Sequence, residues 1–142
     1  MAEIIIFTDG GSRGNPGPAA LGVYITNTKN EVLAKIGEYL GITTNNVAEY
    51  SAIIKGLSWA IENKKNQEIT KIHFYMDSQL ACSQLNGLYK IKNNNIRTMV
   101  FEIHKKEAEL AVPIIYTHIR RENNKQADFM VNVALDNQLK KT

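Results

Sequence analysis

The first third of the chain alternates short apolar runs with turn-forming residues, which is typical of β-strands. Residues 3–8 are β-branched and aromatic and predict a first strand, and residues 21–26 predict a second. Residues 27–30 read Asn-Thr-Lys-Asn and predict a turn. Because residues 32–40 resume the apolar pattern, we expect the second and third strands to pair as an antiparallel hairpin.

From Val47 onward, apolar residues recur every three or four positions, which indicates a helix with one apolar face. We expect this helix to end near residue 63 and to be capped at its start by Thr44, Asn45 or Asn46. The later pattern predicts strands at residues 69–76 and 112–119, and helices at residues 78–85, 95–110 and 123–139.

This order of elements, in which three strands lead and helices and strands then alternate, predicts an α/β fold. We expect a five-stranded mixed sheet, with its first three strands antiparallel, flanked by helices on both faces. The chain has 142 residues, of which 44% are hydrophobic and 22% are charged. This composition suits one globular domain covering residues 1–142.

Charge and cysteine content narrow the function classes. The net charge of +3 at pH 7 permits a polyanionic partner without requiring one. Cys82 is the only cysteine, which excludes an intrachain disulfide and a cysteine-based zinc site and favours a reducing, cytoplasmic setting. No apolar stretch approaches the roughly 18 residues that a membrane-spanning helix needs, so no membrane partner is expected.

Two acidic residues follow predicted strands. Asp9 follows the first strand and Asp77 follows the fourth. In open α/β sheets, ligand sites gather at the carboxyl ends of strands. Each acid also has a simple structural explanation, because Asp9 could form a turn ahead of Gly10 and Asp77 could cap the helix that begins at Ser78.

Two further acids lie on predicted helices. Glu49 falls in the first turn of its helix, beside the apolar stripe, although with Asn46 it also has the spacing of a capping box. Asp128 lies in the middle of the apolar stripe of the closing helix, where an unpaired carboxylate would be desolvated. A buried salt bridge is the structural alternative for Asp128.

Together, the four acids point to a shared cation site. If they converge, like charges about 4 Å apart repel by roughly 4 kcal/mol per pair at an effective dielectric near 20. Such a cluster requires protons or cations, and all-oxygen ligands suit Mg²⁺ or Mn²⁺. An acid cluster that holds two such ions is a standard device for phosphodiester displacement.

Four segments of the chain match, in order and spacing, the active-site motifs of a known family. They are residues 8–18 (TDGGSRGNPGP), 43–50 (TTNNVAEY), 77–80 (DSQL) and 118–128 (HIRRENNKQAD). On these residues the chain resembles the type 1 ribonuclease H family from end to end. The resemblance implies the ribonuclease H-like fold and a metal-dependent endonuclease that cuts the RNA strand of an RNA/DNA hybrid.

The resemblance implies a role for each acid. Asp9 would bridge two Mg²⁺ ions about 3.5–4 Å apart, and Asp128 would help to hold the ion that lowers the pKa of the attacking water. Glu49 and Asp77 would hold the ion that faces the departing 3′ oxygen, and the products would carry a 5′-phosphate and a 3′-hydroxyl. His118 stands at the family's position for a histidine that assists proton transfer or product departure. A strand-end histidine without a chemical task is the alternative for His118.

The resemblance also implies a substrate-binding surface. Without side chains, Gly10 and Gly11 would let the backbone approach a minor groove, where peptide groups can pair with 2′-hydroxyls. That contact distinguishes RNA from DNA without reading sequence. Thr44 would help to seat a phosphate of the DNA strand. The other residues implied for this surface are Ser12, Asn15, Asn45, Asn46, Gln79 and Asn124.

The segment after the third motif departs from some members of the family. Those members carry a basic, tryptophan-containing handle there, whereas residues 84–93 are short and contain only Lys90 and Lys92 as basic residues. The segment resembles the compact forms of the family, so we expect weaker hybrid binding or reliance on other basic residues such as Arg120 and Arg121. We expect a monomer. The alternative functions are cleavage of double-stranded RNA and a non-catalytic nucleic-acid-binding module.

Overall fold

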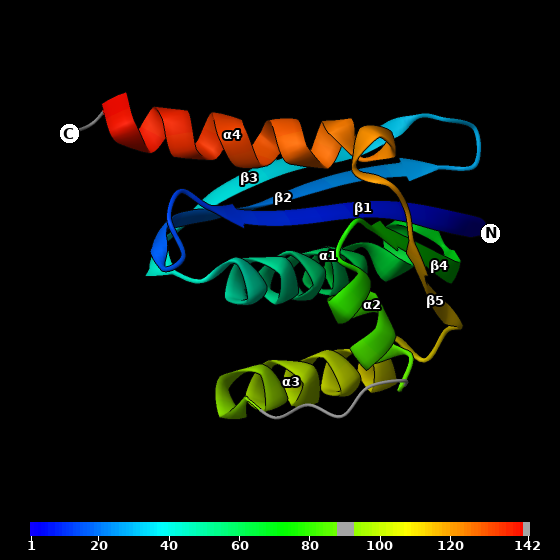
Figure 1. Cartoon of the computed structure of the whole chain (residues 1–142). Coiled ribbons are helices and arrows are strands. Elements are labelled where there is room, and N and C mark those ends of the chain that lie inside the picture. Colours follow the sequence, from blue (N-terminus) through cyan, green and yellow to red (C-terminus); the bar gives the residue numbers. More distant parts are fainter. Residues whose placement is uncertain (88–92, 141–142) are drawn as a thin grey trace.

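Five strands form a single mixed sheet at the centre of the molecule (Figure 1). They are β1 (Ala2–Ser12), β2 (Gly17–Asn27), β3 (Val32–Thr43), β4 (Ile69–Met76) and β5 (Ile114–His118), in the spatial order β3-β2-β1-β4-β5. The first three strands pair antiparallel, whereas β4 is parallel to β1 and β5 to β4, so the predicted sheet is confirmed. The computed structural model describes residues 1–87 and 93–140, and Lys90 and Lys92 lie outside them.

Helices cover both faces of this sheet, as predicted. They are α1 (Asn45–Gln67), α2 (Gln79–Leu85), α3 (Asn94–Leu110) and α4 (Lys125–Lys140), and a 3₁₀ turn at Arg121–Asn123 precedes the last. α4 lies on one face, while α1 lies on the other with α3 packed against it (Figure 1). Within residues 1–87 and 93–140, none of the helices has the length and apolar character that crossing a membrane requires.

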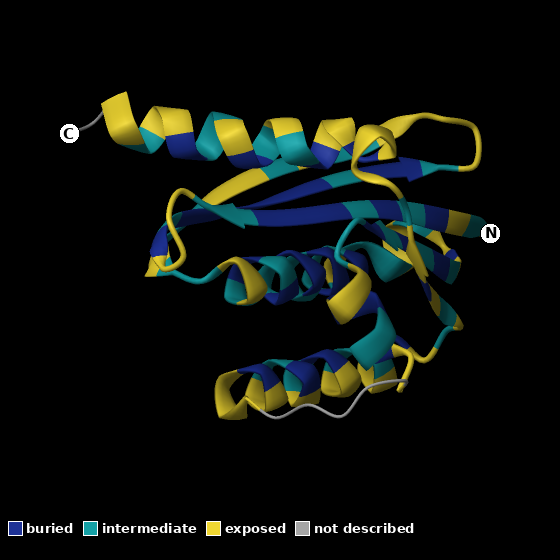
Figure 2. Cartoon of the chain, in the orientation of Figure 1, coloured by how far each residue is buried: buried dark blue, intermediate teal, exposed yellow. Residues whose placement is uncertain are grey.

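The main hydrophobic core lies between the sheet and α1. Ile6, Ile53 and Phe74 are among its fully buried side chains, each of which contributes about 1.5–3 kcal/mol by burial. A smaller cluster that includes Val131 and Leu135 lies beneath α4. The central strands are therefore buried, while the outer sides of α3 and α4 are exposed (Figure 2).

β1 extends further than the sequence predicts, and it includes Asp9. The predicted strand ends at residue 8, whereas the observed strand continues through Gly10 and Gly11 to Ser12. The neighbouring strand is the reason, because antiparallel pairing continues past Asp9, which lies opposite Gly22. Asp9, Gly10 and Gly11 locally favour a turn, but pairing with β2 holds them in extended strand conformation. The expectations that Asp9 follows the strand or forms a turn are wrong.

The parallel partner of β1 ends earlier, and this leaves room for a site. The pairing of β1 with β4 stops at Thr8 and Met76. Within the described part of the chain, no strand lies beside the following residues of β1 on this side. Side chains from both faces of the sheet can therefore meet beyond the carboxyl end of β4. Asp77 is the first residue after β4, as predicted.

Residues other than Glu49 and Asp77 cap the helices α1 and α2. Thr44, one of the predicted caps, precedes α1, and its hydroxyl accepts a hydrogen bond from the N–H three residues later. Because α1 begins at residue 45, Glu49 falls in its second turn, where it cannot cap the helix. Ser78 caps α2 in the same way. The carboxylates of Glu49 and Asp77 are therefore not needed as caps.

Two glycines let helices approach the sheet closely. A Cβ at Gly10 would lie 2.3 Å from the backbone nitrogen of Glu49, so this glycine sets α1 against β1. A Cβ at Gly22 would lie 2.1 Å from the carbonyl oxygen of Ala127, so this glycine sets α4 against β2. Because Gly22 is the cross-strand partner of Asp9, both helices reach the sheet at the same point.

Replacing Gly10 with alanine is expected to destabilise the fold, because the new methyl group would overlap the backbone of α1. Overpacking of this kind typically costs about 1–3 kcal/mol of unfolding free energy. Urea unfolding followed by circular dichroism measures the change. Gly11→Ala is the matched control, because its Cβ would lie 3.5 Å from Val131, an ordinary contact. Equal losses in the two variants would contradict the close approach at Gly10.

Candidate active site

Carboxylates from three elements meet beyond the carboxyl end of β4. Asp9 comes from β1, Glu49 from α1 and Asp77 from the residue after β4, and one oxygen of each lies within 4.8 Å of the others. Asp128, in the first turn of α4, lies close enough to Asp9 to raise its pKa and lines the same cavity of about 280 Å³. The structure therefore brings together the four acids that the sequence analysis selected.

Burial and the repulsion of nearby carboxylates favour the protonated forms of Asp9 and Glu49. Burial is the largest cause that raises the pKa of Asp9 to about 8, and the nearby charges of Asp77 and Asp128 add to it. Burial likewise raises the pKa of Glu49 well above its usual value, with further contributions from Asp9 and Asp77. A bound cation would relieve this repulsion by replacing the protons.

Gly10 packs against α1 and also lines the acidic cavity. It is buried, and the close approach that it allows is to the backbone of α1 at Glu49; its expected contact with a minor groove stays a prediction. Its backbone hydrogen bonding also lowers the pKa values of Asp9 and Glu49, which partly opposes the effect of burial. Gly11 and Ser12 are half-buried and line the cavity, so their backbone remains within reach of a ligand.

Asp128 differs from the prediction in its burial and its partners. The buried residues of α4 are Ala127, Val131 and Leu135, whereas Asp128 is half-buried at the edge of this stripe and lines the cavity. Across the described ranges, no ion pair includes Asp128, so the salt-bridge alternative is wrong. Arg13, which lines the same cavity, pairs with Asp136 at 2.7 Å.

Asn124 is buried behind the carboxylates and orients one of them. Its side-chain nitrogen donates to the carbonyl oxygen of Thr8 at 2.8 Å and to Oδ2 of Asp77 at 3.1 Å. The residue is only 1% exposed. Asn124 was predicted at the substrate-binding surface, but its burial makes it a positioning residue for Asp77.

A second, polar cavity of about 460 Å³ lies between the starts of α1 and α3. Both helix N-termini carry partial positive charge, which suits an anionic group. The α3 side of this cavity is not among the residues predicted from the sequence, although Asn93, which caps α3, is a recognisable N-cap residue. The polar side chains that line it include Asn15, Thr44, Asn45, Asn46, Asn93 and Asn95.

Hydrogen bonds connect the two cavities. Oδ1 of Asn45 accepts from the backbone N–H of Ser12 at 2.8 Å and from its hydroxyl at 3.0 Å. Oδ1 of Asn15 accepts from the backbone N–H of Asn45 at 3.1 Å. These contacts hold the connection between β1 and β2 against the start of α1, so three predicted substrate-binding residues form one polar surface.

His118 and Gln79 are not among the residues that line the acidic cavity. His118 ends β5 and is the register partner of Met76, the residue before Asp77, and it is exposed. Gln79 is the exposed first residue of α2. Their expected roles stay predictions.

Sequence comparisons place the chain among known nucleases. A family model described as reverse transcriptase-like matches residues 7–134. Ribonuclease HI of Halobacterium salinarum is 35% identical over 133 residues, which cover 92% of this chain and 63% of that protein. The bifunctional protein Rv2228c of Mycobacterium tuberculosis is 35% identical over 135 residues, which cover 94% of this chain and 36% of that protein. The chain thus spans about a third of the mycobacterial relative.

Solved structures agree with the sequence comparisons. LC11-RNase H1, solved in complex with an RNA/DNA hybrid, is 40% identical with a TM-score of 0.91, covering 96% of this chain and 99% of that one. The amino-terminal RNase H domain of Rv2228c is 34% identical with a TM-score of 0.86, covering 94% of this chain and 98% of that one. The fold, the four carboxylates and these likenesses agree, and the chain belongs to the type 1 ribonuclease H family.

Proposed function

We propose that residues 1–142 act as one ribonuclease H domain that hydrolyses the RNA strand of RNA/DNA hybrids. The observation that carries this proposal is the convergence of four carboxylates in one cavity, without a neutralising ion pair among the described residues. The likeness to LC11-RNase H1, which was solved with an RNA/DNA hybrid, supports the choice of substrate.

The acidic cluster fits divalent ions that prefer oxygen ligands. One oxygen each of Asp9, Glu49 and Asp77 lies within 4.8 Å of the others, and the raised pKa values of Asp9 and Glu49 are of the kind that a cation would reverse. We assign these acids and Asp128 as the ligands of two Mg²⁺ ions, which Mn²⁺ could replace. When bound, such ions activate a water molecule and stabilise the departing 3′ oxygen, which yields 5′-phosphate and 3′-hydroxyl ends.

The chain's other polar residues orient the acids and bind the hybrid. Asn124 holds Asp77 in place through its side-chain nitrogen. Ser12 and Asn45 form a hydrogen-bonded rim beside the acids, suited to pair with 2′-hydroxyls of the RNA strand. Thr44, in the second cavity, lies where two helix N-termini favour a phosphate of the DNA strand.

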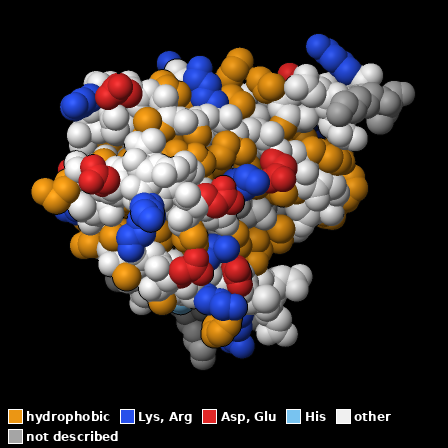
Figure 3. Space-filling view, turned by 180° about the vertical axis from the view of Figure 1, so that it is seen from behind, with side chains coloured by type: hydrophobic (Ala, Val, Ile, Leu, Met, Phe, Trp, Pro, Cys, Tyr) orange, Lys and Arg blue, Asp and Glu red, His pale blue; other side chains and the backbone are white. Residues whose placement is uncertain are grey.

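One face of the protein carries charges of both signs. On the face shown in Figure 3, Lys and Arg side chains are interspersed with Asp and Glu and do not form one continuous basic patch. The net charge of the chain is only +3. Binding is therefore expected to rely on local polar and backbone contacts near the two cavities, with a shallow dependence on salt.

Asp9→Asn is expected to abolish cleavage while the fold stays intact, because it removes a central ligand oxygen without changing side-chain size. The rate should fall by more than about a hundredfold, the loss seen when a group that stabilises transition-state charge is removed. Labelled RNA/DNA hybrid, double-stranded RNA and double-stranded DNA, each with Mg²⁺, Mn²⁺ or chelator, measure activity and substrate class. Glu109→Gln, an exposed acid-to-amide change on α3, is the control. Hybrid cleavage that persists in Asp9→Asn or in excess chelator would refute the mechanism.

Mg²⁺ is expected to raise the thermal midpoint more at about pH 8 than at about pH 5. The folded pKa of Asp9 is about 8, above its ordinary value of 3.8. In the metal-free protein, its contribution to stability is therefore full below pH 3.8 and is lost as pH rises through about 8. Mg²⁺ offsets this loss because it replaces the protons. Thermal unfolding with Mg²⁺ or chelator across this range gives the two curves, and a shift independent of pH would contradict the electrostatic account.

His118→Ala is expected to lower kcat and to leave the Mg²⁺ concentration needed for half-maximal rate unchanged. A group that moves a proton typically contributes about 10²–10⁴-fold, while His118 lies outside the acid cavity and is not assigned to a metal ion. Steady-state cleavage over a range of Mg²⁺ concentrations separates the two effects. His104→Ala, on the exposed side of α3, is the matched control. An unchanged kcat in His118→Ala would make His118 a strand-end residue without a chemical task.

A further inference from the structure

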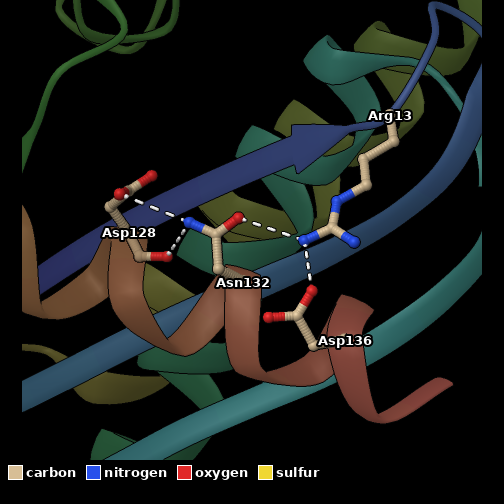
Figure 4. Close-up of polar contacts among 4 residues, drawn as sticks. All are labelled: Arg13, Asp128, Asn132 and Asp136. Atoms are coloured by element: carbon tan, nitrogen blue, oxygen red, sulfur yellow. Dashed lines mark hydrogen bonds and ion pairs between the residues drawn. The ribbon is translucent and has the colours of Figure 1, made fainter. Parts of the chain in front are cut away.

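Asp128, Asn132 and Asp136 lie one turn apart along α4 (Figure 4). The last two contact Arg13, which follows β1. Nδ2 of Asn132 donates to the carbonyl oxygen of Asp128 at 3.1 Å and to its Oδ2 at 3.4 Å. Oδ1 of Asn132 accepts from Nη2 of Arg13 at 3.4 Å, and the same Nη2 donates to Oδ1 of Asp136 at 2.7 Å. This series of contacts starts at an active-site acid, and Asn132 and Arg13 line the acidic cavity themselves.

The chemistry of these groups fixes the direction of each hydrogen bond. A guanidinium only donates, so the oxygen of the Asn132 amide must face Arg13. The nitrogen of the same amide must then face Asp128, where it holds Oδ2 of the carboxylate at the edge of the cavity. Asp136 in turn fixes the guanidinium of Arg13 through a charge-assisted bond.

We propose that Asn132 and Arg13 are positioning residues that set the orientation of the Asp128 carboxylate. The proposal rests on the proposed function, in which Asp128 is an ion ligand. Hydrogen-bonding partners of metal ligands typically change metal affinity by about 10–100-fold when they are removed. Asp136 completes the arrangement by holding Arg13 two turns along the helix from Asp128, so that its charge does not neutralise the acid cluster.

The ion pair itself has little to add to stability. The side chains of Arg13 and Asp136 are 38% and 58% exposed, and exposed ion pairs contribute little to folding. The position of the Arg13–Asp136 ion pair suggests instead that it fixes the arrangement of the elements around the cavity. Arg13 directly follows Ser12, which is hydrogen-bonded to Asn45 of α1. The segment therefore links the helix that carries Glu49 with the helix that carries Asp128, across the cavity.

The first arm of the test needs neither metal nor substrate. Asp9, Asp77, Asp128 and Asp136 are the only aspartates of the chain, so selective ¹³C labelling of aspartate carboxyl groups gives four assignable NMR signals. Asn132→Leu removes the amide at similar size. In metal-free protein it should shift the Asp128 signal and leave the Asp77 signal in place. Asn137→Leu, at an exposed position of α4 outside this series of contacts, is the matched control and should shift neither.

The second arm measures function. In Asn132→Leu, the Mn²⁺ affinity measured by electron paramagnetic resonance without substrate should fall about tenfold, the lower end of the range for such partners. The Mg²⁺ concentration for half-maximal hybrid cleavage should rise by a similar factor, whereas KM for hybrid at saturating Mg²⁺ should not change. The thermal midpoint should match that of Asn137→Leu, which separates positioning from loss of fold.

Arg13→Gln separates positioning from direct substrate binding. If Arg13 acts through Asn132, then Arg13→Gln shifts the Asp128 signal, weakens Mn²⁺ binding, and adds nothing to the effect of Asn132→Leu in the double variant. A raised KM for hybrid with unchanged Mn²⁺ affinity would instead make Arg13 a substrate contact. An unmoved Asp128 signal in Asn132→Leu would overturn the proposal. Asn132→Leu could shift the Asp128 signal while the wild-type protein neither binds Mn²⁺ nor cleaves hybrid. That outcome would overturn the proposed function and leave the positioning of Asp128 by Asn132 intact.

Discussion

The close approach of two helices to adjacent strands decides where the acids of this protein lie. Gly10 of β1 leaves no room for a side chain against the start of α1, and Gly22 of β2 leaves none against the start of α4. Since Gly22 lies opposite Asp9 in the sheet, the two helices reach the sheet from opposite faces at one level. Because β4 stops at Met76, carboxylates from both faces can then meet beyond its end.

The packing that stabilises the fold also opposes the ionisation of two active-site acids. Hydrophobic burial holds α1 and the sheet together, and it also desolvates Asp9 and Glu49 and so favours their neutral forms. Hydrogen bonds from neighbouring residues hold the carboxylates in fixed orientations, which suits the binding of a cation. The donors are the N–H of Gly10, the amide of Asn124 and the amide of Asn132, and each contacts an acid directly.

Local patterns in the sequence predicted much of the architecture. The switch from alternating to helical periodicity at Val47 placed α1, and each predicted strand and helix is present. The spacing of the four motifs identified the acids, because residue type and order along the chain carry that information. Local reasoning failed for Asp9 and Gly10, which resemble turn residues in isolation but are held in a strand by pairing with β2.

The sequence by itself determined the order of the elements, the family and the residues of the acid cluster, since these depend on periodicity and motif. Only the tertiary structure decided how those residues are supported. Gly10 serves the packing of α1, Asn124 is buried behind Asp77, and Arg13 reaches across to α4. These roles depend on contacts between residues far apart in the chain, for which neighbouring residues leave no periodic signal.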